Sequence, residues 1–178
     1  MEIEIRPYEE SDRADWMRTH AVILSISHAW NYSIQERPAY KGHATTRLVA
    51  VTEAKIVGLL DAAYENTPGE YCFLRDSLGG YVFEFGRLPE YAGANLGTRL
   101  MDAAAADAAA KGFRRLEYWS QDRTAQRFYR RLGLPEIGRH YRFRMKPPAA
   151  LASVIDTQYI GVEYLYCACL PEEWPRVR

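Results

Sequence analysis

The stretch FEFGRLPEYAGANLG, residues Phe83 to Gly97, decides the fold that we expect for this chain. It begins as a strand, turns at Pro89, and ends in a loop with two glycines before an alanine-rich run, TRLMDAAAADAAAK. Alanine is the strongest helix former, so a helix is predicted here that ends at Gly112. The first amides of a helix have no partner within it and attract anions, so the loop predicts a phosphate site. An ordinary strand-to-helix turn is the alternative interpretation.

The segment after this helix predicts a parallel pair of strands. Arg114 to Ser120 alternates as a strand, and a strand, a helix and a strand in succession favour parallel pairing. Asp122 is then expected to be the N-cap of a further helix, whose apolar face includes Phe128 and Tyr129. Gly133 is expected to end that helix.

The rest of the chain predicts a mostly antiparallel sheet. Apolar or alternating runs predict strands at 2–7, 47–51, 55–64, 71–74, 136–145 and 158–170. Trp16, His20, Ile23 and Leu24 recur at helical spacing, so helix is expected over about 12–30. At 178 residues the chain suits one α+β (mixed α/β) domain, residues 1–178, in which segment 148–178 supplies the last strand.

Composition and charge exclude several classes of function. No apolar run approaches the roughly 20 residues that cross a bilayer, and the N-terminus has no signal-peptide pattern, so we expect a cytoplasmic protein without a membrane partner. Residues 111–146 hold eleven Lys and Arg against three acids, but no stacking or groove-reading motif accompanies them, so no nucleic-acid partner is expected. The three cysteines and four histidines show no spacing typical of a metal site or a catalytic triad, so no metal is expected.

Two motifs, in this order, resemble those of a known family. PEYAGANLG before a helix, followed after a strand by D-x-x-A-x-x-F-Y-R-R-L-G-L, is similar to the motifs V-L-P-E-Y-R-G-K-G-I-G and N-x-x-A-x-x-F-Y-x-K-x-G-F of the GNAT superfamily. Its members are acyl-CoA-dependent N-acetyltransferases, and the specific match covers residues 81–134. The resemblance implies a mixed, mostly antiparallel sheet of about six to seven strands flanked by helices. In that fold a parallel pair of strands splays apart at the cofactor site.

The resemblance also implies acetyl-CoA as the cosubstrate. In the family a strand backbone pairs with the pantetheine arm, and here that strand segment is Phe85, Gly86 and Arg87. The loop amides that hold the pyrophosphate match Gly93, Ala94, Asn95, Leu96, Gly97 and Thr98. Two positions depart from the pattern: Ala92 replaces the arginine or glutamine of the family, and Asn95 replaces its middle glycine. Asparagine tolerates positive φ, so the remaining amides can still bind phosphate.

Tyr129 falls on the usual general acid of the family, which protonates the departing CoA thiolate. A phenol stays protonated near neutrality, so the chemistry fits. Glu84 is the candidate base, because an amine is mostly ammonium at pH 7 and must lose a proton before it attacks. Packing in the apolar stripe is the alternative for Tyr129, and a salt bridge is the alternative for Glu84. Arg127, Arg130 and Arg131 could reach CoA phosphates, with a solvated helix face as the alternative.

The function implied is transfer of an acetyl group from acetyl-CoA to an amine of a small molecule or peptide by direct attack. A non-catalytic acyl-CoA-binding or regulatory domain is the alternative. Residues 24–45 and 65–80 flank the expected cleft and are expected to set the choice of acceptor. The sequence identifies neither the acceptor nor the acyl length, and it leaves a homodimer open.

Overall fold

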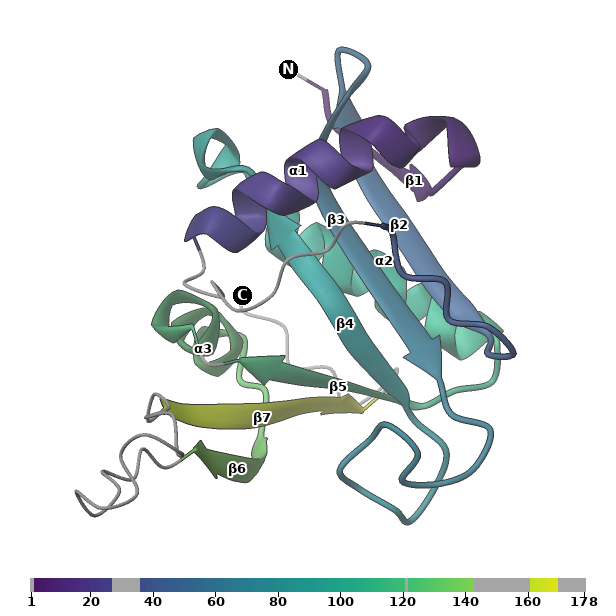
Figure 1. Ribbon diagram of the computed structural model, residues 1–178. Coiled ribbons are helices and arrows are strands. Elements are labelled where there is room, and N and C mark those ends of the chain that lie inside the picture. The colour runs from purple at the N-terminus through teal and green to yellow at the C-terminus, as the bar shows by residue number, and fades with distance from the viewer. Residues whose placement is uncertain (1, 27–35, 121, 143–160, 170–178) are drawn as a thin grey trace, which may run out of the picture.

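Strand β4 lies at the centre of a seven-stranded sheet with helices on both faces (Figure 1). The computed structural model describes residues 2–26, 36–120, 122–142 and 161–169. Across the sheet the strands follow the order β1-β2-β3-β4-β5-β7-β6. All neighbours are antiparallel except β4 and β5, which run parallel. The predicted mixed, mostly antiparallel sheet is therefore confirmed.

The elements lie close to where the sequence predicts them. The strands are β1 (Glu4–Pro7), β2 (Thr45–Thr52), β3 (Lys55–Tyr64), β4 (Gly80–Arg87), β5 (Arg115–Ser120), β6 (Glu136–Arg142) and β7 (Gly161–Cys169). The helices are α1 (Arg13–Ile26), α2 (Leu96–Ala110) and α3 (Arg123–Arg131), and short 3-10 helices cover Glu10–Asp12 and Pro89–Tyr91. The predicted ends at 27–30, 143–145, 158–160 and 170 lie outside the described residues. No helix in the described part of the chain is long and apolar enough to cross a membrane.

Separate apolar clusters hold the helices on the two faces. Leu100 and Met101 of α2 and Tyr129 of α3 pack in the larger cluster, together with side chains of β3 and β5. Trp16 and Ile23 of α1 pack on the opposite face of the sheet. Strand β3 is buried from Ile56 to Tyr64 because it is covered on both sides, which explains its nearly continuous apolar sequence.

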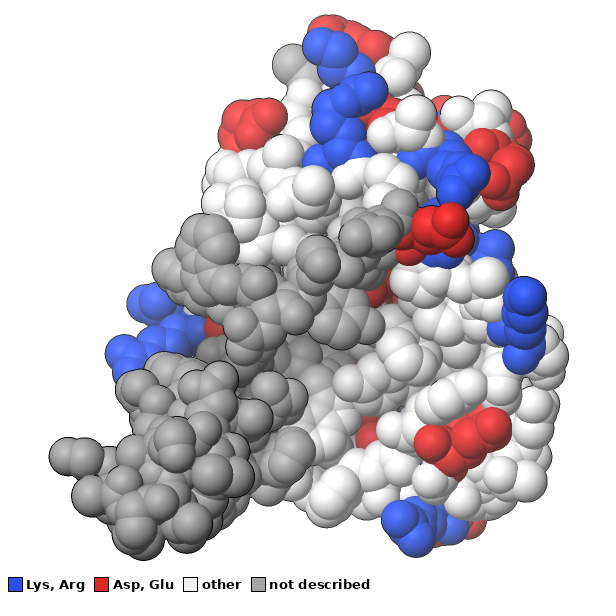
Figure 2. All heavy atoms as spheres, viewed as in Figure 1, with Lys and Arg blue, Asp and Glu red and all other residues white. Residues whose placement is uncertain are grey.

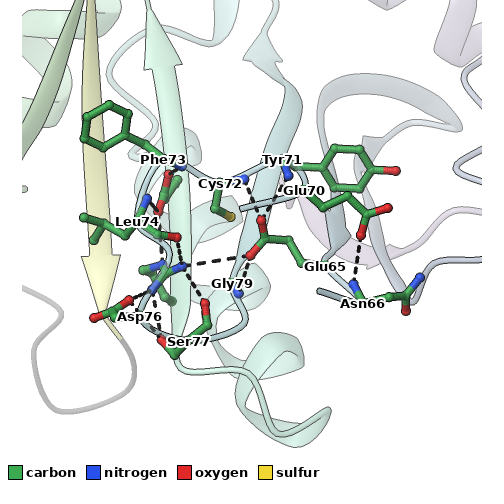
Figure 3. A network of polar contacts seen from close by, with 12 residues as sticks. Glu65, Asn66, Glu70, Tyr71, Cys72, Phe73, Leu74, Asp76, Ser77 and Gly79 are labelled. Carbon is green, nitrogen blue, oxygen red and sulfur yellow. Dashed lines mark hydrogen bonds and ion pairs between the residues drawn. The ribbon is translucent and has the colours of Figure 1, made fainter. Parts of the chain in front are cut away.

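The prediction of a strand at Tyr71–Leu74 is wrong. These residues lie in the loop between β3 and β4, and their amides bind carboxylates instead of a neighbouring strand (Figure 3). The amides of Tyr71 and Cys72 donate to Glu65 Oε1 at 3.0 and 2.8 Å. The next two amides, of Phe73 and Leu74, donate to the carboxylate of Glu117 on β5. Charged acceptors of this kind satisfy backbone donors that a strand would otherwise pair.

Arg115 offsets the charge of these buried carboxylates. Its guanidinium lies 3.0 Å from Glu117 Oε1 and 2.6 Å from Asp76 Oδ1, and it donates to two backbone carbonyls of the same loop. Burial disfavours the charged form of Glu65, but the amides of Cys72, Tyr71 and Gly79 outweigh it and hold the pKa of Glu65 below its ordinary value. The loop is therefore attached to β5 by hydrogen bonds to buried charges.

We expect Glu65→Gln to lower the free energy of unfolding at pH 7 by about 2–3 kcal/mol, because it removes a charged acceptor from buried amides. The folded-state pKa of Glu65 lies below the ordinary value of 4.5. The ionised carboxylate of Glu65 therefore makes its full contribution to the free energy of unfolding above pH 4.5. That contribution is lost as the pH falls through the lower folded-state pKa. Denaturant unfolding from pH 7 to acid should show the difference between wild type and variant shrinking.

The matched control is Glu70→Gln, which changes an exposed carboxylate in the same loop. We expect that variant to stay within about 0.5 kcal/mol of wild type. A Glu65→Gln protein as stable as wild type, or a difference that grows in acid, would contradict the role given to Glu65.

Candidate functional site

Strands β4 and β5 pair over a short stretch and then separate. Gly80, Tyr81 and Val82 pair with the segment 116–118, and no pair follows in the part of the chain that is described. Beyond this point lies a cleft of about 1070 Å³, lined by α1, β4, β5, the loop before α2, and α3. The volume is comparable with the roughly 300–1,000 Å³ of small-molecule sites. This is the splayed parallel pair that the family resemblance predicts.

A β-bulge in β4 decides which of its side chains face α1. Asp61 of β3 pairs with Glu84 and the next residue of β3 pairs with Val82, so Phe83 is the extra residue. Side chains on a regular strand alternate between its faces. Here Val82 and Phe85 both pack toward the cluster beneath α2, whereas Glu84 contacts α1. The bulge therefore turns Glu84 to the face that α1 covers.

Glu84, the predicted base, lies in the cleft and contacts His20 of α1. Its Oε2 is 2.6 Å from His20 Nε2, and the two residues are 9% and 2% exposed. The imidazole stacks on Trp16, one helical turn earlier, with ring centroids 4.7 Å apart. The contact becomes an ion pair when His20 is protonated. The sequence predicts no catalytic role for His20, whose one signal is a polar ring within the apolar stripe of the helix.

Tyr129 of α3, the predicted acid, lines the same cleft. It is 4% exposed, and its ring centroid lies 5.4 Å from that of Tyr118 and 6.3 Å from that of Phe85. The carboxylate of Asp122 accepts a hydrogen bond from the amide of Ala125 at 2.8 Å, so the predicted N-cap of α3 is confirmed. The cap sets where α3 begins and thus where Tyr129 faces the cleft.

The loop before α2 presents backbone amides to the cleft. Gly93 and Asn95 have φ values of +87° and +53°, in the left-handed region. No side chain caps the helix at Asn95, so the first amides of α2 have no acceptor within the helix. Asparagine thus adopts the backbone conformation for which glycine is the usual residue. Of the nine predicted cofactor residues, Ala94 does not line the cleft. The other eight do line it: Phe85, Gly86, Arg87, Gly93, Asn95, Leu96, Gly97 and Thr98.

Three arginines line the cleft near the loop. They are Arg87 at the end of β4 and Arg127 and Arg131 of α3, whereas Arg130 is not among the lining residues. The guanidinium of Arg131 lies over the ring of Phe128, 5.8 Å from its centroid. Guanidinium groups and helix-start amides both favour phosphate, so this end of the cleft suits a ligand with several negative charges.

A second buried carboxylate lies beside Glu84. Asp61 is fully buried, and its Oδ2 is 2.6 Å from Arg37 Nη2. Burial raises the pKa of Asp61 to about 6, against the opposing effect of Arg37. Within the described residues neither Asp61 Oδ1 nor the hydroxyl of Tyr40 has a hydrogen-bond partner. The described residues contain no group of His, Cys, Asp and Glu arranged to hold a metal ion.

Comparison with known proteins agrees with this geometry. Residues 3–134 match the sequence model of the Acetyltransferase (GNAT) family. Arabidopsis thaliana NAA60 in complex with a bisubstrate analogue shares the fold at a TM-score of 0.65 and 16% identity, over 94% of this chain and 98% of that one. Polyamine N-acetyltransferase of Drosophila melanogaster shares the fold at a TM-score of 0.62 and 16% identity, over 95% of this chain and 100% of that one.

A third solved structure adds a bound ligand. The PaiA N-acetyltransferase of Thermoplasma acidophilum, in complex with coenzyme A, matches at a TM-score of 0.62 and 14% identity, over 93% of this chain and 98% of that one. At such low identities the likeness shows a shared fold. A search of curated proteins finds no significant match.

Proposed function

The chain is an acetyltransferase of the GNAT family, and we propose that it transfers an acetyl group from acetyl-CoA to an amine of a small molecule or peptide by direct attack. One observation carries the proposal: a carboxylate, a tyrosine and an anion-binding loop line a single cleft. Relatives of the same fold include a protein solved with coenzyme A and one that acts on polyamines. These relatives support the class of reaction.

The residues of the cleft fit acetyl-CoA, which supplies an activated acetyl thioester. Beyond Val82, β4 has no pair on its β5 side within the described residues. Its backbone at Phe85 to Arg87 is therefore able to pair with the amides of the pantetheine arm. The uncapped amides at the start of α2 hold the pyrophosphate, and Arg127 and Arg131 lie close enough to the same end to favour its charge.

Glu84 takes the proton of the attacking amine. An ordinary alkylammonium group has a pKa near 10, so it must be deprotonated before its nitrogen can bond to the acetyl carbon. The carboxylate faces the cleft, and His20 fixes its orientation through the 2.6 Å contact. His20 is therefore a positioning residue, held in turn by its stacking on Trp16.

Tyr129 donates a proton to the departing thiolate as the carbon–sulfur bond breaks. A phenol has a reference pKa of about 10, so it is protonated at neutral pH and can protonate a thiolate of comparable basicity. Glu84 passes this first proton to solvent and then takes the second proton, which the nitrogen loses once it has bonded to the acetyl carbon. Glu84 releases that proton to solvent as well, and Tyr129 regains one proton from solvent. Acetylation of an ammonium substrate therefore releases one proton overall. The products are the N-acetylated amine and the free thiol of CoA.

Incubation with acetyl-CoA and a panel of amines, with free thiol followed over time, tests the function. We expect calorimetric binding of CoA and release of thiol with at least one amine. Failure to bind CoA would overturn the proposal. Binding without thiol release for any acceptor would favour a non-catalytic acyl-CoA-binding domain.

We expect Tyr129→Phe to lower kcat by about 10²–10⁴-fold, because it removes the proton donor for the leaving thiolate. CoA affinity should stay the same, as calorimetry would show, because the ring and its packing remain. Tyr8→Phe is the matched control, since Tyr8 lies beneath Arg37 and outside the cleft. An unchanged kcat in Tyr129→Phe would remove Tyr129 from the mechanism.

We expect Glu84→Gln to lower kcat/KM at pH 7 by about 10²-fold or more, because the amine loses its proton acceptor. The ratio of variant to wild-type activity should recover toward pH 10, where more of the amine is already unprotonated. Glu90→Gln, at an exposed residue outside the cleft lining, is the control. A loss of equal size at every pH would argue against Glu84 as the base.

A further inference from the structure

Aromatic rings line the cleft at the start of β4, before the point where Glu84 lies. Tyr81 and Phe83 are both lining residues. The ring centroid of Phe83 lies 4.6 Å from that of Tyr81, 4.9 Å from that of Tyr40 and 5.4 Å from that of Tyr71. We call these four residues the aromatic cluster. Phe83 is its centre and remains 36% exposed.

The surrounding structure holds the aromatic cluster in place. Tyr71 belongs to the loop in Figure 3, where its amide donates to the buried carboxylate of Glu65. Its hydroxyl lies 2.7 Å from His43 Nε2. The cluster therefore needs little reorganisation to receive a ligand, and such preorganisation favours binding.

The two ends of the cleft differ in chemistry. Phe83 precedes Arg87 by four residues, roughly 13 Å along a strand. The amide loop follows Arg87 in the chain, and Phe128 of α3, which Arg131 lies over, is next to Gly97 of that loop. Figure 1 shows α1 in front of the sheet, and in Figure 2 the described surface of that face below α1 is mostly uncharged. One end thus suits the phosphates of the cosubstrate, and the other suits an apolar group.

The bulge brings this apolar surface next to the proposed base. Val82 faces the cluster beneath α2, so its neighbour Tyr81 faces the α1 side, and Phe83 packs against Tyr81 there. The extra residue in β4 then places Glu84 on the same side. Neighbouring Cα atoms are about 3.8 Å apart, so a group on the ring of Phe83 lies a short chain away from the carboxylate.

We propose that the acceptor is an amine joined by a short chain to a planar apolar group, which packs against the exposed part of the Phe83 ring while its nitrogen reaches Glu84. This inference rests on the proposed acetyl transfer and specifies its substrate class. The buried carboxylate next to Glu84 gives no added preference for a polycation, because Arg37 pairs with Asp61 at 2.6 Å. A polyamine would also leave the ring of Phe83 in water.

Rates with 2-phenylethylamine, n-butylamine and spermidine test this assignment. We expect wild type to prefer 2-phenylethylamine in kcat/KM by about tenfold, the scale of an aromatic contact plus burial of its area. Phe83→Leu stays apolar but loses the flat ring. The ratio of kcat/KM for 2-phenylethylamine to kcat/KM for n-butylamine should therefore fall toward one, and the change should be in KM. Phe83→Tyr keeps the ring and should keep the ratio. Phe73→Leu is the control, because Phe73 is exposed and lies outside the cleft lining.

Calorimetry of 2-phenylethylamine with CoA present separates this inference from the proposed function. If no amine is acetylated but 2-phenylethylamine binds and Phe83→Leu weakens it, the aromatic subsite stands and the proposed function fails. If acetylation occurs with n-butylamine or spermidine as efficiently as with 2-phenylethylamine, or if Phe83→Leu keeps the ratio, the inference is overturned and the proposed function stands. Absence of both binding and acetylation overturns both.

Discussion

The site depends on the point at which β4 stops pairing with β5. Within the described residues, strand pairing joins β4 to β5 only from Gly80–Val82 to Leu116–Tyr118. Strand β4 nevertheless stays in the sheet because β3 pairs with it from Gly58 to Tyr64. Backbone groups on the open side of β4 therefore face a cleft without a loss of order in the sheet. Unpaired backbone donors and acceptors favour any ligand that supplies partners, and an extended chain of amides does so.

Buried charges are paired both in the cleft and in the loop that precedes β4. Glu65 and Glu117 bind the amides of the loop before β4 and share Arg115, which ties that loop to β5. In the cleft, His20 holds Glu84. An isolated buried charge is costly, so each of these carboxylates is matched by donors. Of these pairs, only His20 and Glu84 line the cleft. Their contact lowers the cost of burying the carboxylate and also orients it toward the cleft.

Local signals in the sequence predict the helices and the loop well, whereas long-range partners lie beyond such signals. Alanine content, the cap at Asp122 and the glycine loop act over a few residues, and the elements they predict are present. The strand predicted at Tyr71–Leu74 is absent because the backbone amides of this segment donate hydrogen bonds to the carboxylates of Glu65 and Glu117. The contact between His20 and Glu84 joins residues 64 positions apart, and the bulge that orients Glu84 arises from pairing with β3. Neither leaves a periodic pattern in the sequence.

The most direct test of whether the opening between β4 and β5 is the cofactor site is an NMR titration of the isotope-labelled protein with CoA. The measurement is the change in chemical shift of each backbone amide. The account predicts that the amides of Phe85 to Arg87 and of Gly93 to Thr98 shift together with one affinity. The amides of the loop from Glu65 to Gly79 should stay unchanged. Shifts confined to other parts of the chain, or none in the two predicted segments at saturating CoA, would contradict it.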